Sequence, residues 1–286
     1  MNCVIVIPVY KDTPTATERA SIRQTFRVLG KHDIVFVTHE DCQLDEYEKI
    51  VTSEQGILRT ELFDKRYFDS VAHYSDLCFS EEFYLRFKGY EYMLICQTDA
   101  WVFHDELDYW CSQGFDYIGA PIYFPRNEQH FTEVFYGVGN GGFSLRKISH
   151  CLRIVRHDRH KILLKPKALM RMYWYYFLYN EAFTQNIFKR MTLVGKLVVK
   201  CLGFGNTVRF FIRNHINEDM LFGTWAKQSW GLGDSNIPDE LTAASFSMEL
   251  NAPMLYKKLG GRLPLGCHAF EKWNYEDFWI DHIHLD

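Results

Sequence analysis

The 286-residue sequence has no internal repeat, no low-complexity segment and no long hydrophobic run. Its eight cysteines are scattered without a Cys-x-x-Cys pair, which excludes a disulfide miniprotein. We interpret them as reduced, mostly buried thiols of a cytosolic protein. The apolar stretch 4–9 has no basic segment before it and contains Pro8, so we expect neither a signal peptide nor a spanning helix.

Net charge is also small, at −4, which gives no reason to expect a nucleic-acid partner. The composition is 47% hydrophobic and 24% charged, which is typical of a globular protein and excludes disorder, collagen and a coiled coil. By length, either one large α/β domain or two small ones would fit.

Positive charge is concentrated in residues 161–213. This segment has ten basic residues against the single acid Glu181, a local charge of +9, so the remainder of the −4 chain carries −13. The ten are Lys161, Lys165, Lys167, Arg171, Lys189, Arg190, Lys196, Lys200, Arg209 and Arg213. Two apolar runs, 170–179 and 193–204, lie among them. The segment is either a helical hairpin packed on the main domain or a surface that lies on an anionic bilayer.

In the first half, apolar runs of strand length alternate with segments of helical period, which predicts a parallel or mixed sheet covered by helices. We expect strands at 3–9, 33–38, 57–63, 92–96 and 116–119. Helices are expected at 17–29 and, as one long amphipathic helix, at 69–87. A glycine-rich turn is predicted at 137–142, before the strand-like residues 143–146.

Asp99 follows the expected strand 92–96, and ligands of open α/β sheets bind beyond the carboxyl ends of strands. A carboxylate there can accept a ribose hydroxyl or hold a cation that bridges a diphosphate. Alternatively, Asp99 caps a helix that starts near Asp105. The glycines at 137, 139 and 142 match a dinucleotide fingerprint, but they lie mid-chain before a strand. They are more typical of close backbone approach to a ligand, or of a plain tight turn.

Two acids, Glu218 and Asp219, precede the apolar residues 220–222 and could simply cap a helix. If that helix begins at a cleft, one carboxylate could act as a general base toward a hydroxyl nucleophile. His268 is either a core histidine or a group that contacts metal or phosphate.

Four segments, 18–26, 97–103, 136–145 and 218–223, resemble in their order those of glycosyltransferases of the GT-A fold. They are most similar to the Fringe and β-1,3-galactosyltransferase branch and to a bacterial group encoded with surface-polysaccharide genes. The resemblance covers most of the chain outside the basic segment. It implies one GT-A domain over residues 1–286, a Rossmann-like mixed α/β sheet flanked by helices, with a basic, aromatic helical insertion at about 161–213.

By position, the resemblance makes Asp219 the catalytic base, with Glu218 beside it, and His268 a contact of metal or diphosphate. It also implies a set of nucleotide- and donor-binding residues: Pro8, Val9, Tyr10, Arg23, Asp99, Ala100, Trp101, Gly141 and Gly142. Trp101 stands where the family's Asp-x-Asp motif has its second acid. Asp99 and His268 alone supply few of the roughly six ligands that Mg²⁺ or Mn²⁺ takes, so metal dependence stays open.

The implied activity is transfer of a sugar from a nucleoside diphosphate donor to a hydroxyl of a glycan, with inversion, in bacterial cell-surface polysaccharide synthesis. With the basic segment, this predicts a cytoplasmic enzyme that docks on the inner leaflet and uses a lipid-linked acceptor, without nucleic acid. A non-catalytic nucleotide- or sugar-binding module derived from a transferase, and a nucleotide-dependent dehydrogenase, are the alternatives.

Overall fold

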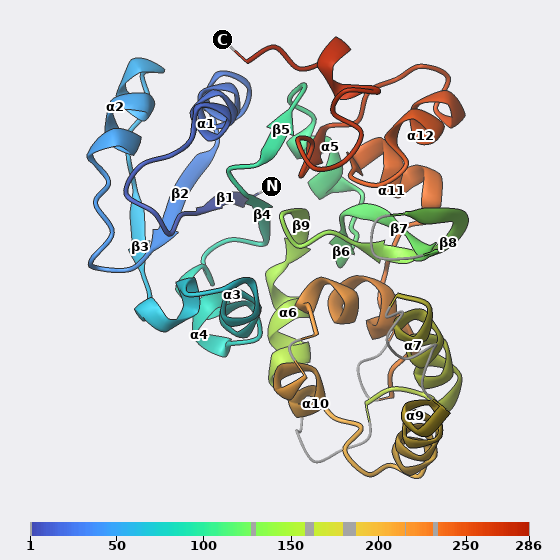
Figure 1. The fold of residues 1–286 in the computed structure, drawn as a ribbon. Coiled ribbons are helices and arrows are strands. Elements are labelled where there is room, and N and C mark those ends of the chain that lie inside the picture. The colour runs from blue at the N-terminus through green and yellow to red at the C-terminus, as the bar shows by residue number, and fades with distance from the viewer. Residues whose placement is uncertain are drawn as a thin grey trace.

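A six-stranded mixed sheet lies at the centre of the computed structural model, which describes residues 2–126, 130–157, 163–179, 187–214, 216–230 and 234–285 (Figure 1). Its strand order is β3-β2-β1-β4-β9-β6. The strands are β1 (Cys3–Pro8), β2 (Asp33–Thr38), β3 (Thr60–Leu62), β4 (Tyr92–Cys96), β6 (Tyr117–Ile118) and β9 (Phe143–Lys147). The first four are mutually parallel, and β9 runs antiparallel to both β4 and β6. The expected mixed sheet flanked by helices is confirmed.

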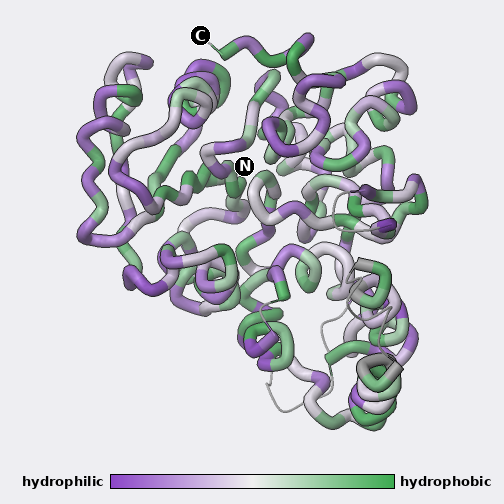
Figure 2. The backbone as a smooth tube through the Cα atoms, viewed as in Figure 1, coloured by the Kyte–Doolittle hydropathy of each residue, from purple (hydrophilic) through white to green (hydrophobic). Residues whose placement is uncertain are grey.

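Strand β1 is buried on both faces, as its unbroken Val/Ile run predicts. Val4 and Val6 pack toward α3 (Val71–Cys78), α4 (Glu81–Arg86) and α6 (Ile148–Val155). Ile5 and Ile7 pack toward α1 (Ala16–Leu29), α2 (Asp45–Ser53) and α5 (Leu107–Ser112). Figure 2 shows the hydrophobic colour along these central strands. The sheet is therefore the middle of three layers.

The long helix expected at 69–87 is wrong, because the segment forms two helices. Helix α3 ends at Cys78, and α4 begins at Glu81. Ser80 accepts a hydrogen bond from the backbone N–H of Phe83, 3.2 Å away, and so caps the new helix. A short helix, η1 (Lys65–Phe68), precedes α3. The chain therefore turns twice beside the carboxyl ends of β1 and β4.

A two-stranded hairpin and a three-stranded sheet complete the strands. The hairpin pairs β7 (Ala120–Pro125) with β8 (Phe131–Gly139), and the small sheet has the order β10 (Ser247–Met248), β11 (Gly266–His268), β5 (Ala100–Val102). The expected turn at 137–142 is too long, because Gly137 and Gly139 belong to β8. Antiparallel pairing places His268 of β11 opposite Ala100 of β5, and hence next to Asp99.

Below the sheet, a lobe is formed by α7 (Pro166–Tyr179), α9 (Ile187–Cys201) and α10 (Val208–Arg213) (Figure 1). Its helical character is as predicted; Lys161 and Glu181 lie outside the described residues. Within the described ranges, no helix is both long and apolar enough to cross a bilayer. The other helices are η2 (Met220–Trp225), η3 (Ala226–Gln228), α11 (Glu240–Phe246), α12 (Ala252–Lys258) and η4 (Trp279–Asp281). All eight cysteines are free, and only Cys201 is not buried.

Candidate functional site

Two adjoining chambers lie at the carboxyl ends of β1 and β4. The first chamber has a volume of about 410 Å³ and the second about 390 Å³. Val71, Tyr74 and Gln97 line both, so the chambers form one cleft. This is where open α/β sheets bind their ligands.

The first chamber combines aromatic rings with carboxylates. Its wall includes Pro8 and Tyr10 after β1, Asp99 after β4, and Phe68 of η1. Glu18, at the start of α1, also lines this chamber. Burial alone would raise the pKa of Glu18, but the ion pair with Lys11, at 2.9 Å, helps to keep that pKa below its ordinary value. Aromatic rings can stack on a base, and carboxylates can accept ribose hydroxyls.

Not every residue implied by the resemblance lies in this chamber. Val9, Ala100 and Trp101 are buried in the core, and the Trp101 ring packs edge-on against Phe270. Arg23, on α1, is not among the residues that line either chamber. None of these four residues lines either chamber.

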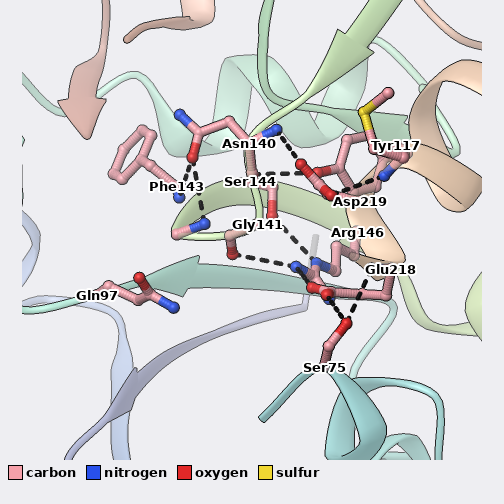
Figure 3. Close-up of polar contacts among 12 residues, drawn as sticks. Ser75, Gln97, Tyr117, Asn140, Gly141, Phe143, Ser144, Arg146, Glu218 and Asp219 are labelled. Carbon is pink, nitrogen blue, oxygen red and sulfur yellow. Dashed lines mark hydrogen bonds and ion pairs between the residues drawn. The ribbon is translucent and has the colours of Figure 1, made fainter. Parts of the chain in front are cut away.

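Asp219 is the buried carboxylate of the second chamber, at the start of η2. Its Oδ2 accepts a hydrogen bond from the backbone N–H of Asn140 and its Oδ1 one from that of Met220, both at 2.7 Å (Figure 3). Burial and the neighbouring charge of Glu218 raise the pKa of Asp219 to about 7, although the hydrogen bonds from the two N–H groups act to lower it. Such a group both takes and gives up a proton near neutral pH.

Glu218 points away from Asp219 into a buried ion pair. Its Oε1 lies 2.8 Å from Nη2 of Arg146, which is fully buried on β9, and Ser75 Oγ donates to its Oε2 at 2.8 Å (Figure 3). Arg146 also donates to the carbonyl of Gly141 and to Ser144 Oγ. The charge of Glu218 is thus engaged within the protein. Sequence reasoning missed Arg146 and Ser75; a cation inside the buried strand 143–147, before the partly exposed Lys147, was the available signal for the first.

The turn between β8 and β9 supports both sides of this site. The Oδ1 atom of Asn140 accepts hydrogen bonds from the N–H groups of Gly142 and Phe143, at 3.2 and 3.1 Å. A Cβ at Gly142 would overlap the His268 ring. Glycine is therefore required at 142, because the His268 ring approaches the backbone here.

His268 lies between two carboxylates. Its Nε2 is 3.2 Å from Oδ1 of Asp99, and its Nδ1 is 3.4 Å from Oε1 of Glu249. Burial would lower the His268 pKa, but these carboxylates outweigh it and raise the pKa to about 10. In turn, the positive charge of His268 lowers the pKa of Asp99, although burial of Asp99 acts to raise it. The helix-cap alternative for Asp99 is wrong, because Asp105 accepts the bond from Leu107 N–H at the start of α5.

The side chains at this point supply few ligands for a divalent cation. Asp99 and Glu249 face opposite nitrogens of His268, so a single cation bound at one nitrogen would contact only one of the two carboxylates. In the part of the chain that the structure describes, no three His, Cys, Asp or Glu side chains form a group that could hold a metal ion. His268, paired with these two carboxylates, lies where the two chambers meet, with Asp99 on the wall of the first and His268 on the wall of the second.

Three solved structures similar to this chain are as follows. Core-mannan synthase A from Aspergillus fumigatus, in a Mn/GDP form, matches with 11% identity and a TM-score of 0.38, over 52% of this chain and 60% of that one. GlyE, a glycosyltransferase of Streptococcus pneumoniae, matches with 13% identity and a TM-score of 0.40, over 94% of this chain and 54% of that one. S. aureus TarS matches with 12% identity and a TM-score of 0.31, over 52% of this chain and 48% of that one.

No curated protein matches the sequence. A family model described as "Protein of unknown function (DUF5672)" matches residues 57–268, which is more than half of the chain. The match includes the Asp99, Gly141, Glu218, Asp219 and His268 positions, and β1 and α1 lie outside it. The chain therefore belongs to the DUF5672 family.

Proposed function

We propose that the chain is a glycosyltransferase, with one GT-A domain over residues 1–286, that moves a sugar from a nucleoside diphosphate to a hydroxyl of a glycan. The observation that carries the proposal is Asp219. It is a buried carboxylate with a pKa of about 7, in a chamber that opens into the ligand-binding edge of an α/β sheet.

The donor nucleotide fits the first chamber. The base lies among the rings of Tyr10, Phe68 and Tyr74, and a ribose hydroxyl donates to Asp99. The diphosphate then lies near Gln97, where the two chambers meet. There the cation of His268, with Lys272 on the wall of the second chamber, balances its negative charge.

The acceptor hydroxyl enters the second chamber beside Asp219. Its oxygen forms a bond to the anomeric carbon while Asp219 takes the hydroxyl proton. The bond from that carbon to the diphosphate oxygen breaks, and its electron pair leaves with the nucleoside diphosphate. Attack from the opposite face inverts the configuration, through a transition state that resembles an oxocarbenium ion. Glu218 is not the base, because Arg146 and Ser75 already engage its carboxylate.

The finer parts of the proposal rest on the four sequence segments that resemble the Fringe branch and its bacterial relatives. They are a hexosyl donor, a bacterial surface polysaccharide as the product and action at the cytoplasmic side. Asp99 and His268 would supply two of the ligands of a divalent cation, and the diphosphate and water would supply the others.

Thermal unfolding against UDP, GDP, CDP, dTDP, NAD and NADP, each with and without Mn²⁺, tests the proposal. A ligand at 100 times its dissociation constant adds about 2.7 kcal/mol, enough to raise the midpoint by a few degrees. We expect one nucleoside diphosphate to do so, and its dependence on Mn²⁺ decides whether Asp99 and His268 hold a metal. Stabilisation by NAD or NADP alone would favour a dehydrogenase. Stabilisation without hydrolysis of the matching nucleotide sugar and without transfer would indicate a binding module.

A further inference from the structure

Helix α9 exposes an apolar face. Five large apolar side chains on α9 and just after it are more than half exposed: Phe188 (76%), Met191 (68%), Val194 (60%), Val198 (52%) and Leu202 (69%). Successive members are three or four residues apart, which places them along one side of the helix. Figure 2 shows hydrophobic segments on α9 at the lower right, at the edge of the molecule.

The opposite face of α9 is anchored. Leu193, Leu197 and Cys201, spaced four residues apart, pack against the main hydrophobic core. Helix α7 lies beside α9 and exposes Met170 and Trp174, by 53% and 55%, one helical turn apart. Helix α9 is therefore fixed to the core of the protein, and both α7 and α9 carry exposed apolar side chains.

The lobe that carries this face has no acidic residue in its described parts, 163–179 and 187–214. Lys165, Lys167, Lys196, Arg209 and Arg213 are exposed. Lys200 turns inward, where its Nζ donates to the carbonyl of Gly205 at 2.8 Å and lies 3.4 Å from the centre of the Phe210 ring. An apolar strip on a lobe whose described charged side chains are all positive complements a surface that is both apolar and anionic.

We propose that the exposed face of α7 and α9 docks on an anionic phospholipid bilayer. The apolar strip enters the boundary between headgroups and acyl chains, Trp174 lies at headgroup level, and the cations contact lipid phosphates. A bilayer fits better than an acidic protein, because the strip is a convex helix face with few directional polar groups. The helix lies on the membrane and does not cross it.

Docking bears on the proposed function without depending on it. Tyr175 of α7 lines the second chamber, so a docked lobe holds the acceptor side of the cleft close to the bilayer. This favours an acceptor glycan linked to a lipid, and that extension rests on the proposed function. The docking itself rests on the lobe alone.

The test is cosedimentation of the full chain with phosphatidylcholine vesicles that contain or lack phosphatidylglycerol. We expect binding to the anionic vesicles, weakened by salt. Lys196→Glu should reduce it about tenfold, and Val194→Glu with Val198→Glu about a hundredfold. Ile57→Glu is the matched control: Ile57 is 73% exposed between α2 and β3, across the molecule from the lobe, and its replacement should leave binding unchanged (Figure 1).

Three results would overturn docking. The first is absence of wild-type binding to anionic vesicles, and the second is equal binding by all variants. The third is self-association of the wild type without vesicles that Val194→Glu with Val198→Glu abolishes, which would make the face an interface between copies. Nucleotide stabilisation and sugar transfer to a soluble acceptor are measured separately, so failure of docking and failure of the proposed function are distinguishable.

Discussion

The cleft and the lobe depart from the usual arrangement of a globular protein in opposite directions. In the cleft, charged groups are inside: Arg146 is 0% and Glu218 3% exposed. In the lobe, apolar groups are outside: Phe188 is 76% and Met191 68% exposed. Buried charge and clustered exposed apolar surface are both informative exceptions, because each has a free-energy cost unless something compensates it.

The compensation differs between the two regions. Each buried charge of the cleft has a partner within the chain, so the cleft should be rigid and sensitive to change. Met191, Val194, Val198 and Leu202 of the apolar face are more than half exposed, so substitutions there should affect association more than folding. The following predictions test this contrast.

The largest expected effect is on turnover. Asp219→Asn removes the group that takes the acceptor proton and should lower turnover by about three orders of magnitude. Initial rates with a nucleotide-sugar donor measure this. Nucleotide stabilisation should remain, since Asp219 does not line the first chamber. Near-normal turnover would remove Asp219 from the chemistry.

The neighbouring acid should matter for folding instead. Glu218→Gln leaves the fully buried Arg146 without its counter-ion and should lower the free energy of unfolding by about 3–5 kcal/mol. Urea denaturation measures the loss. Ser75→Ala, which removes only the hydrogen bond to Glu218, should cost about 1 kcal/mol. Equal losses in the two variants would contradict a stabilising ion pair.

As pH rises, ionisation of Asp219 should increase the activity and decrease the stability of the fold. Its folded pKa of about 7 exceeds the ordinary 3.8, so its contribution to stability is full below pH 3.8 and is lost as pH rises through about 7. The rate kcat/KM should rise over the upper part of that window, as the base ionises. Paired pH profiles of rate and of unfolding midpoint measure this. In Asp219→Asn the residual rate should lack the step near 7.

The smallest effect should come from the exposed face of α9. Val198→Gln should change the free energy of unfolding by no more than about 0.5 kcal/mol. Leu197→Gln, one position away on the packed face, should cost clearly more. Denaturation of the two variants side by side measures the difference. A large loss for Val198→Gln would mean that this face packs within the protein.

The local pattern predicted the sheet and the approximate place of the cleft. Strands such as 3–8 and 92–96 are apolar throughout, which periodicity detects directly. Asp99 and His268 were candidates, and strand pairing brings them together. The role of Glu218 was not predictable, since Arg146 lies 72 residues away in sequence and Ser75 143. The break at Ser80 could not be predicted from periodicity, because the helical period continues through residues 69–87. The capping side chain of Ser80 nevertheless starts a new helix there.

The pairing of β11 with β5 also determines at what point during synthesis of the chain the cleft can form. It joins His268 to a partner, Gln97, that lies 171 residues earlier in the chain. At about 5–20 residues per second, a ribosome makes the sheet strands many seconds before it makes this histidine. Until then, Asp99 faces an edge without its cation. The nascent chain can therefore assemble a core well before the cleft is complete, which delays ligand capture until His268 has been made.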